Sequence, residues 1–311
     1  MNQKIMLLLK GFAMGLADIV PGVSGGTVAF ITGIYDELLA SIASVNAAFV
    51  RQLLKFQFKN ALAQIHFEFL APLLIGIASA VLLTSRLMHF LLNEYPIYTW
   101  SLFFGLILAS ALYIAKHIKR PDNKLNYLFL PAGALIGWAL VSLIPVQTPE
   151  SYPYVFGAGA IAICAMILPG ISGSFILLIL GKYAFITGAL KNPFEAGNLA
   201  LILVFCLGCL TGILSFSKLL NYLMHTHRNA MMFILTGFMF GSLKKIWPWK
   251  EVLEQTVIRG KEYVLREENI MPRALDQETI LAIFIMFIGF FLVLGLEYIS
   301  NKSQRGVSSA G

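Results

Sequence analysis

Residues 21–26 read PGVSGG, residues 169–174 read PGISGS, and both stretches interrupt long apolar runs. Proline removes a backbone hydrogen bond from a helix, and glycine leaves the backbone poorly constrained. At membrane depth, backbone groups freed by such a break are tolerated only where protein or a water-filled cavity covers them. We call the two stretches the first break (21–26) and the second break (169–174), and we expect both to lie at functional positions.

The composition indicates a membrane protein with several crossings. The chain of 311 residues is 58% hydrophobic and 13% charged, with a mean hydropathy of +0.77, whereas about a quarter of the residues of a soluble domain are charged. Apolar segments long enough to cross a bilayer core of about 30 Å recur along the chain. The net charge of +7 is typical of cytoplasmic loops rich in Lys and Arg, and we expect no nucleic-acid partner.

The three cysteines predict no special chemistry. Cys164, Cys206 and Cys209 all lie in apolar runs, where a free cysteine usually packs as a small apolar residue. We therefore expect neither a disulfide framework nor a metal site, and no cofactor.

The two halves of the chain resemble each other. Aligning Pro21 with Pro169, 148 positions later (169 − 21), superposes Ser24 on Ser172. A later block, SRLMHFLLNEYPIYTWSLFFGLILAS at 85–110, lies over SKLLNYLMHTHRNAMMFILTGFMFGS at 217–242. The alignment predicts two repeats, at 1–150 and 151–311, which together form a single integrated membrane domain.

Charge in the loops predicts the topology. The loop KHIKRPDNK (116–124) is strongly basic and is expected in the cytoplasm, whereas VQTPESYP (146–153) carries one acid and no base and is expected outside. The pattern fits one re-entrant helical hairpin plus three transmembrane helices in each repeat, so six full crossings, with both termini cytoplasmic. Because three is odd, the second repeat is inverted, which is a transporter architecture. The predicted fold is therefore an all-α polytopic membrane protein with two inverted repeats; the role of the 247–278 loop stays open.

The breaks predict an anion site. A helix that begins after each break has unpaired N–H groups and the positive end of the helix dipole, which favour an anion such as phosphate. The serines could cap these helices or donate their hydroxyls. Arg86 and Lys218 occupy equivalent positions of the two repeats within apolar helices; such charges usually face a site, although snorkelling to the interface is the alternative. The residues expected at the breaks are Pro21, Gly22, Pro169 and Gly170, and those expected around the phosphate are Ser24, Gly25, Gly26, Thr27, Arg86, Ser172, Gly173, Ser174 and Lys218.

Asp18 precedes the first break by three residues and has only Met166 opposite it in the second repeat. It is expected either to cap the broken backbone or to bind a coupling proton or sodium ion.

Three motifs carry a family resemblance. GLADIVPGVSGGTVAFITGIYDELLASI (15–42), LPGISGSFILLILGKY (168–183) and GFMFGSLKKIWPWK (237–250) resemble those of the polyprenyl-phosphate transporter family, the undecaprenyl phosphate translocases. The resemblance covers most of the chain. It implies a lipid flippase, not an enzyme, that returns undecaprenyl phosphate from the outer to the inner leaflet of the bacterial cytoplasmic membrane, for reuse as the lipid carrier of peptidoglycan synthesis. The residues alone predict a transporter with an anion site.

Two alternatives stay open. One is a secondary transporter of a small soluble anion such as phosphate, because a site at the breaks would suit free phosphate too. The other is an intramembrane serine hydrolase, because GVSG and GISG match a GxSG loop and His89 lies in a nearby helix. Transport direction, coupling ion, tail-length preference and oligomeric state are not specified by the sequence.

Overall fold

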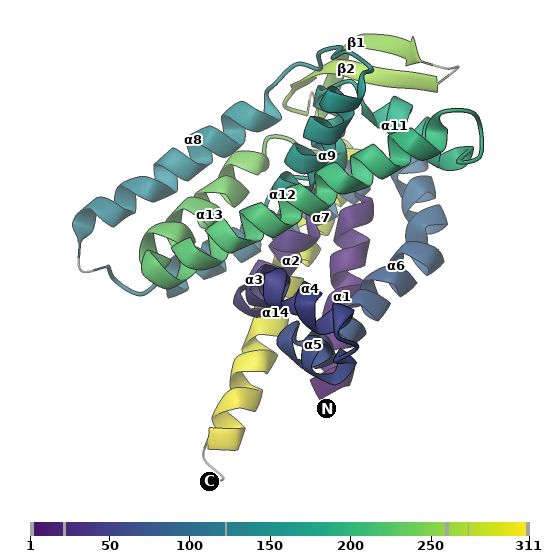
Figure 1. Cartoon of the computed structure of the whole chain (residues 1–311). Coiled ribbons are helices and arrows are strands. Elements are labelled where there is room, and N and C mark those ends of the chain that lie inside the picture. The colour runs from purple at the N-terminus through teal and green to yellow at the C-terminus, as the bar shows by residue number, and fades with distance from the viewer. Residues whose placement is uncertain (1–2, 21–22, 122, 259–260, 273, 309–311) are drawn as a thin grey trace.

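The computed structural model in Figure 1 is helical apart from one β-hairpin. It describes residues 3–20, 23–121, 123–258, 261–272 and 274–308. The prediction of an all-α polytopic membrane protein is confirmed, with the hairpin as an addition within the 247–278 segment.

The first half begins with a helix, a break and two short helices, followed by longer helices. In chain order these are α1 (Gln3–Ile19), α2 (Gly25–Ile31), α3 (Tyr35–Ala43), α4 (Ala47–Leu54), α5 (Phe58–Gln64), α6 (Phe67–Glu94), α7 (Pro96–His117), the 3₁₀ turn η1 (Lys124–Leu128) and α8 (Phe129–Val141).

The second half repeats the order, without counterparts of α4 and α5 and with the β-hairpin added. It contains α9 (Tyr152–Ile167), α10 (Gly173–Ile179), α11 (Tyr183–Lys191), α12 (Asn198–Thr226), α13 (Arg228–Ser242), β1 (Lys250–Ile258), the antiparallel β2 (Lys261–Asn269) and α14 (Gln277–Ser308).

The segment after each break is bent a second time, which its continuous apolar run did not predict. The axes of α2 and α3 differ by 119°, and those of α10 and α11 by 113°. A glycine with positive φ lies in each bend, Gly33 at +70° and Gly181 at +65°, a region that glycine enters without a side-chain clash. The two bends therefore occur at positions that the repeat alignment makes equivalent.

The helix pairs also match between the halves. Helix α1 packs on α6 and α9 on α12, while α7 packs on α14 and α13 on α8. Close approach of α6 to α1 depends on Gly76, where a Cβ would lie 2.2 Å from the Leu8 carbonyl oxygen; on α12, a Cβ at Gly208 would lie 2.1 Å from that of Phe156. Equivalent glycines thus permit equivalent helix contacts.

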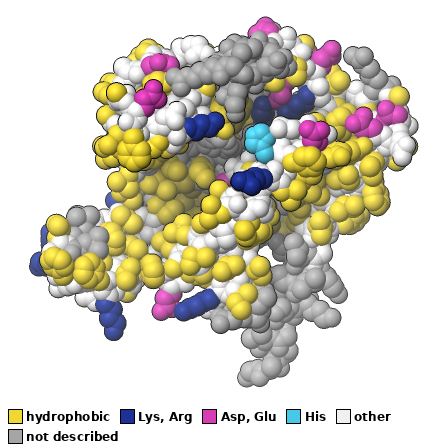
Figure 2. All heavy atoms as spheres, turned by 90° about the vertical axis from the view of Figure 1, so that its right-hand side faces the viewer, with side chains coloured by type: hydrophobic (Ala, Val, Ile, Leu, Met, Phe, Trp, Pro, Cys, Tyr) yellow, Lys and Arg dark blue, Asp and Glu magenta, His cyan; other side chains and the backbone are white. Residues whose placement is uncertain are grey.

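In the part of the chain that the structure describes, five segments are long and apolar enough to cross a membrane: α6, α7, η1 with α8 (Lys124–Val141), α12 and the Gln277–Gly295 part of α14. The expected sixth crossing, α13, has 15 residues, so the count differs from the prediction by this short helix. Figure 2 shows hydrophobic side chains over much of one face, with charged side chains gathered mainly along its upper part. Leu82 and Leu83 are 81% and 75% exposed, as expected of side chains that face lipid.

Candidate functional site where the two breaks meet

The helix that follows the first break is capped from within its own segment. The Gly25 amide donates a hydrogen bond to Asp18 Oδ1 at 2.7 Å, and the Gly26 amide donates to Ser24 Oγ at 3.0 Å. Ser24 is the N-cap of α2, in extended backbone geometry. Asp18 therefore acts as a cap, one of its two expected roles; its coupling role stays a prediction.

The two breaks lie against each other. Ser24 Oγ donates to the Met166 carbonyl at 2.8 Å, and the Gly170 amide donates to Thr27 Oγ1 at 2.8 Å. Ser24 is 0% and Thr27 1% exposed. A Cβ at Gly26 would lie 2.4 Å from the Ile167 carbonyl oxygen, so only glycine permits this approach. We call this contact between residues 24–27 and 166–170 the break junction.

The second break lacks the capping arrangement of the first. Ser172 is the N-cap of α10 but makes no side-chain cap hydrogen bond; its Oγ is instead 2.7 Å from Ser174 Oγ. Gly173 is buried, and a Cβ there would lie 2.8 Å from the Ala162 carbonyl oxygen. Helix α10 thus keeps an N-terminal end whose donors no side chain caps in the described structure.

Of the residues expected at the helix breaks, Pro169 and Gly170 are buried, and Gly170 has φ +93°. Pro21 and Gly22 lie outside the described residues.

The two expected cations lie apart from the break junction. Arg86 on α6 and Lys218 on α12 both have exposed side chains, at equivalent places about two turns before each helix ends. Within the described part, no hydrogen bond or ion pair joins either cation to Ser24 or Ser172. Their contact with phosphate therefore stays a prediction beside the snorkelling alternative.

An apolar cavity of about 620 Å³ reaches Val23 and Thr27 beside the break junction, and it was not foreseen from the sequence. We call it the apolar cavity. No charged side chain is among the described residues that line it. The hydroxyls of Thr32, Thr99 and Ser110 donate to the backbone carbonyls of Val28, Tyr95 and Leu106. Its lining residues are Ala13, Leu16, Ala17, Val23, Thr27, Val28, Ile31, Thr32, Met88, Leu91, Tyr95, Tyr98, Thr99, Leu102, Phe103, Leu106, Ile107, Ser110, Ile285 and Val293.

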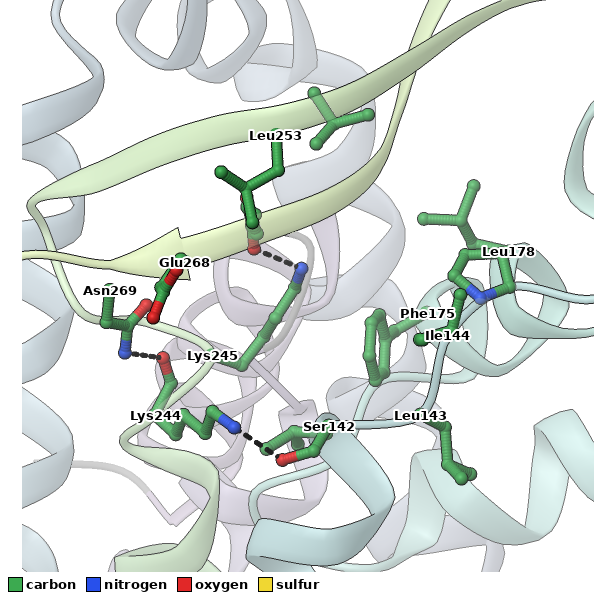
Figure 3. Close-up of a pocket in the computed structure, with 14 residues that line it drawn as sticks. Ser142, Leu143, Ile144, Phe175, Leu178, Lys244, Lys245, Leu253, Glu268 and Asn269 are labelled. Atoms are coloured by element: carbon green, nitrogen blue, oxygen red, sulfur yellow. Dashed lines mark hydrogen bonds and ion pairs between the residues drawn. The ribbon is translucent and has the colours of Figure 1, made fainter.

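A second cavity of about 320 Å³ lies between the end of α8, helix α10 and the β-hairpin (Figure 3). We call it the hairpin cavity. Lys244 and Lys245 line it, and Lys245 Nζ lies 2.6 Å from Glu267 Oε1. The adjacent lysines in the motif GFMFGSLKKIWPWK were the available sequence signal, since charged residues beside the apolar helices of a membrane protein often mark a functional site.

The geometry does not form the catalytic pair that a serine hydrolase needs. The hydroxyl of Ser24 bonds to the Met166 carbonyl and that of Ser172 to Ser174. His89 Nδ1 is 2.9 Å from the side-chain amide of Asn93. Within the described residues, no group of three or more His, Cys, Asp and Glu side chains is arranged to hold a metal ion.

Comparison with known proteins agrees with the motifs. A family model described as undecaprenyl phosphate translocase-like matches residues 14–263. A protein of Vibrio cholerae serotype O1 named polyprenyl-phosphate transporter is 43% identical over 302 residues, which cover 94% of this chain and 96% of that protein. A Staphylococcus aureus protein of the same name is 33% identical over 255 residues, covering 78% of this chain and 85% of that protein. No solved structure matches the chain significantly.

Proposed function

Because the chain belongs to the undecaprenyl phosphate translocase-like family, we propose that it carries undecaprenyl phosphate from the outer to the inner leaflet of the bacterial cytoplasmic membrane. Polyprenyl-phosphate translocation is the function that the family and its named relatives support. Return of this carrier lipid would supply peptidoglycan synthesis inside the cell. The step moves a lipid without making or breaking a covalent bond, so no catalytic residue is assigned.

The observation that carries this proposal is the apolar cavity beside the break junction. A polyprenyl chain can pass from the hydrocarbon core of the bilayer into an apolar cavity at little cost, because both surroundings are apolar. The phosphate needs hydrogen-bond donors within reach of that space. Thr27 belongs both to the apolar cavity and to the break junction, so tail and head group could be held side by side.

The head group is assigned to the residues around the break junction. The start of α10 at Ser172, Gly173 and Ser174 offers uncapped N–H groups and the positive dipole end. Residues Ser24 to Thr27 lie across the break junction from this helix start and form the other side of the proposed phosphate site. Arg86 and Lys218 are proposed to attract or contact the phosphate from the exposed parts of α6 and α12.

Inward movement of this lipid needs a driving ion. Moving one negative charge against an inside-negative potential costs about 2.3 kcal/mol per 100 mV, and co-transport of a proton or a sodium ion would offset that. Asp18 is proposed as the group that binds the ion, because its carboxylate already lies at the first break.

The orientation is also a proposal. Helix α1 begins and α14 ends at one end of the molecule, opposite the β-hairpin (Figure 1). This supports cytoplasmic termini with the hairpin outside. Equivalent helix pairs in 1–150 and 151–311 support two repeats, for which we propose the inverted relation.

Transport of a small soluble anion is less well supported, because no charged side chain is among the described residues that line the apolar cavity. Proteoliposomes containing the purified chain separate the two functions. We expect flipping of polyprenyl phosphate and no uptake of inorganic phosphate, and native mass spectrometry should detect copurified lipid phosphate. Uptake of inorganic phosphate without lipid flipping would contradict the proposal.

A matched pair of variants ties the function to the apolar cavity. Val28→Trp fills the apolar cavity and should reduce lipid flipping at least tenfold. Leu82→Trp, on the exposed side of α6, is the control and should flip lipid at the parent rate.

A further inference from the structure

The hairpin cavity has one cationic and one apolar wall. Lys244 and Lys245, in the turn that follows α13, line it together with Glu267 of β2, while Phe175 and Leu178 of α10 and Ile144 form carbon walls (Figure 3). Pockets of about this size commonly take small ligands with a few placed polar groups. The lining therefore suits a ligand with an anionic head and an apolar chain.

One carboxylate oxygen accepts hydrogen bonds from two lysines. Glu267 Oε1 accepts from Lys245 Nζ at 2.6 Å and from Lys250 Nζ at 2.8 Å. The side chains of Lys245, Lys250 and Glu267 are 19%, 11% and 24% exposed. Two largely buried cations without an anion would be costly, so Glu267 keeps them paired.

The third lysine has a neutral partner. Lys244 Nζ donates to Ser142 Oγ at 2.7 Å and lies 4.6 Å from the centroid of the Trp138 ring. Lys244 and Lys245 thus line the hairpin cavity, and Lys250 lies next to it through Glu267, which bonds to Lys245 and Lys250. Glu268 adds a second carboxylate to the lining. The excess of positive charge favours a further anion.

We propose that Lys244, Lys245, Lys250 and Glu267, which we call the hairpin site, form a loading site for the phosphate monoester head of the lipid, with Glu267 as an exchangeable counter-ion. The inference rests on the proposed lipid function. An arriving phosphate displaces Glu267 from Lys245 and also accepts from Lys244, while Lys250 keeps Glu267. The first isoprenyl units then pack against Phe175 and Leu178.

Chemistry and position both favour this exchange. A phosphate monoester carries more charge and more acceptor oxygens than a carboxylate, so it can bond to two ammonium groups at once. Phe175 is the third residue of α10, which begins at the second break. The same short helix therefore joins the hairpin site to the break junction, the proposed place of the head group during transport.

Binding to the full chain in nanodiscs tests the proposal. Two of the four tryptophans, Trp100 and Trp138, lie against Lys250 and Lys244, so tryptophan fluorescence should report occupancy. The probes are polyprenyl phosphate, the neutral polyprenol and inorganic phosphate. We expect saturable binding of the first, at least tenfold weaker binding of the second, and no binding of inorganic phosphate at comparable concentration.

The diagnostic result is a pair of opposite effects. Lys245→Gln should weaken binding of polyprenyl phosphate at least tenfold, whereas Glu267→Gln, which removes the competing charge, should strengthen it severalfold. Lys244→Gln is a second test that does not depend on the bonds of Glu267, because it leaves both the Lys245 and the Lys250 bond intact. It should also weaken binding of polyprenyl phosphate about tenfold. Exposed Lys119→Gln and Glu278→Gln are charge-matched controls and should bind as the parent does.

Each contrary outcome has one meaning. If Glu267→Gln folds and binds as weakly as Lys245→Gln, then Glu267 is structural and the exchange is refuted. If the lysine variants bind and flip lipid as the parent does, the hairpin site is refuted while the proposed function stands. Comparable binding of inorganic phosphate would overturn the assignment to a lipid head. Failure of the parent to bind or flip polyprenyl phosphate would overturn the proposed function itself.

Discussion

The hydroxyl oxygen of Thr27 accepts a hydrogen bond from the amide of Gly170 at 2.8 Å, and this bond joins two residues that lie 143 positions apart in the chain. Thr27 is almost completely buried, so water cannot replace its hydroxyl as the partner. The bond therefore links the geometry of the two halves at the point where the apolar cavity ends.

Thr27→Val should destabilise the chain by about 1–3 kcal/mol, because it leaves the buried Gly170 amide without an acceptor. Thr27→Ser keeps the hydroxyl and should lose less, about 1 kcal/mol for one methyl group. Thermal unfolding in detergent measures both. Equal melting temperatures for the two variants would show that the bond contributes nothing.

Gly26→Ala should separate the breaks, since its Cβ would lie 2.4 Å from the Ile167 carbonyl oxygen. We expect at least a tenfold loss of lipid flipping. Gly157→Ala is the control: nothing lies within 4 Å of its Cβ, and alanine in a helix is favoured over glycine by about 0.5–1 kcal/mol. Parent-like flipping by Gly26→Ala would mean that the close approach is not needed.

The sequence predicted the class, the breaks and the equivalence of the halves because these depend on hydropathy and on glycine and proline positions. The offset of 148 positions that aligns Pro21 with Pro169 also aligns Gly33 with Gly181, and these two glycines lie in equivalent bends. The bends themselves were not predicted, because a continuous apolar run does not reveal a change of helix direction.

Other features depend on contacts between distant segments. The bond from Ser24 to Met166 and the apolar cavity could not be foreseen, since no local pattern specifies which apolar side chains leave space between them. The bond of Lys245 to Glu267 on β2 likewise arises from the hairpin, a segment whose role the sequence left open.

Asp18 combines a cap with a charge, and two substitutions separate them. Asp18→Asn keeps an oxygen that can accept from the Gly25 amide but removes the charge. We expect it to bind lipid and to lose its response to an imposed proton or sodium gradient, whereas Asp18→Ala should also be less stable by about 1 kcal/mol through loss of the cap. Lipid-flipping assays under an imposed proton gradient and under an imposed sodium gradient measure this response. If Asp18→Asn responds to both gradients as the parent does, Asp18 is a cap alone.

Arg86→Ala tests the exposed cation on α6. If the guanidinium contacts the phosphate, its loss should weaken head-group binding at least tenfold, since charge-assisted bonds contribute about 1.5–3 kcal/mol. Lys218→Ala should act in the same direction at the equivalent place. Parent-like binding with normal expression would instead favour snorkelling.

The lowered pKa of Lys250 predicts that the stability of the folded chain depends on pH. Burial, with the neighbouring charge of Lys245, lowers the pKa of Lys250 from 10.5 to about 8, despite the opposing effect of Glu267. Between pH 8 and 10.5 the unfolded chain holds this proton and the folded chain does not, so the contribution of Lys250 to stability rises with pH across that window. Below pH 8 both states are protonated, and the folded state bears a constant penalty of at most about 3 kcal/mol.

Lys250→Met isolates this contribution, because methionine can still pack against the Trp100 ring that Lys250 covers. The melting temperature of the parent, measured relative to Lys250→Met, should rise by a few degrees, roughly 2–8 °C, between pH 7 and pH 9.5. Titration of other groups occurs in both proteins and largely cancels. Although burial opposes it, the charges of Lys245 and Lys250 hold the pKa of Glu267 below its usual value, so Glu267 stays ionised between pH 7 and pH 9.5. A difference that is constant with pH would mean that Lys250 keeps its proton when folded.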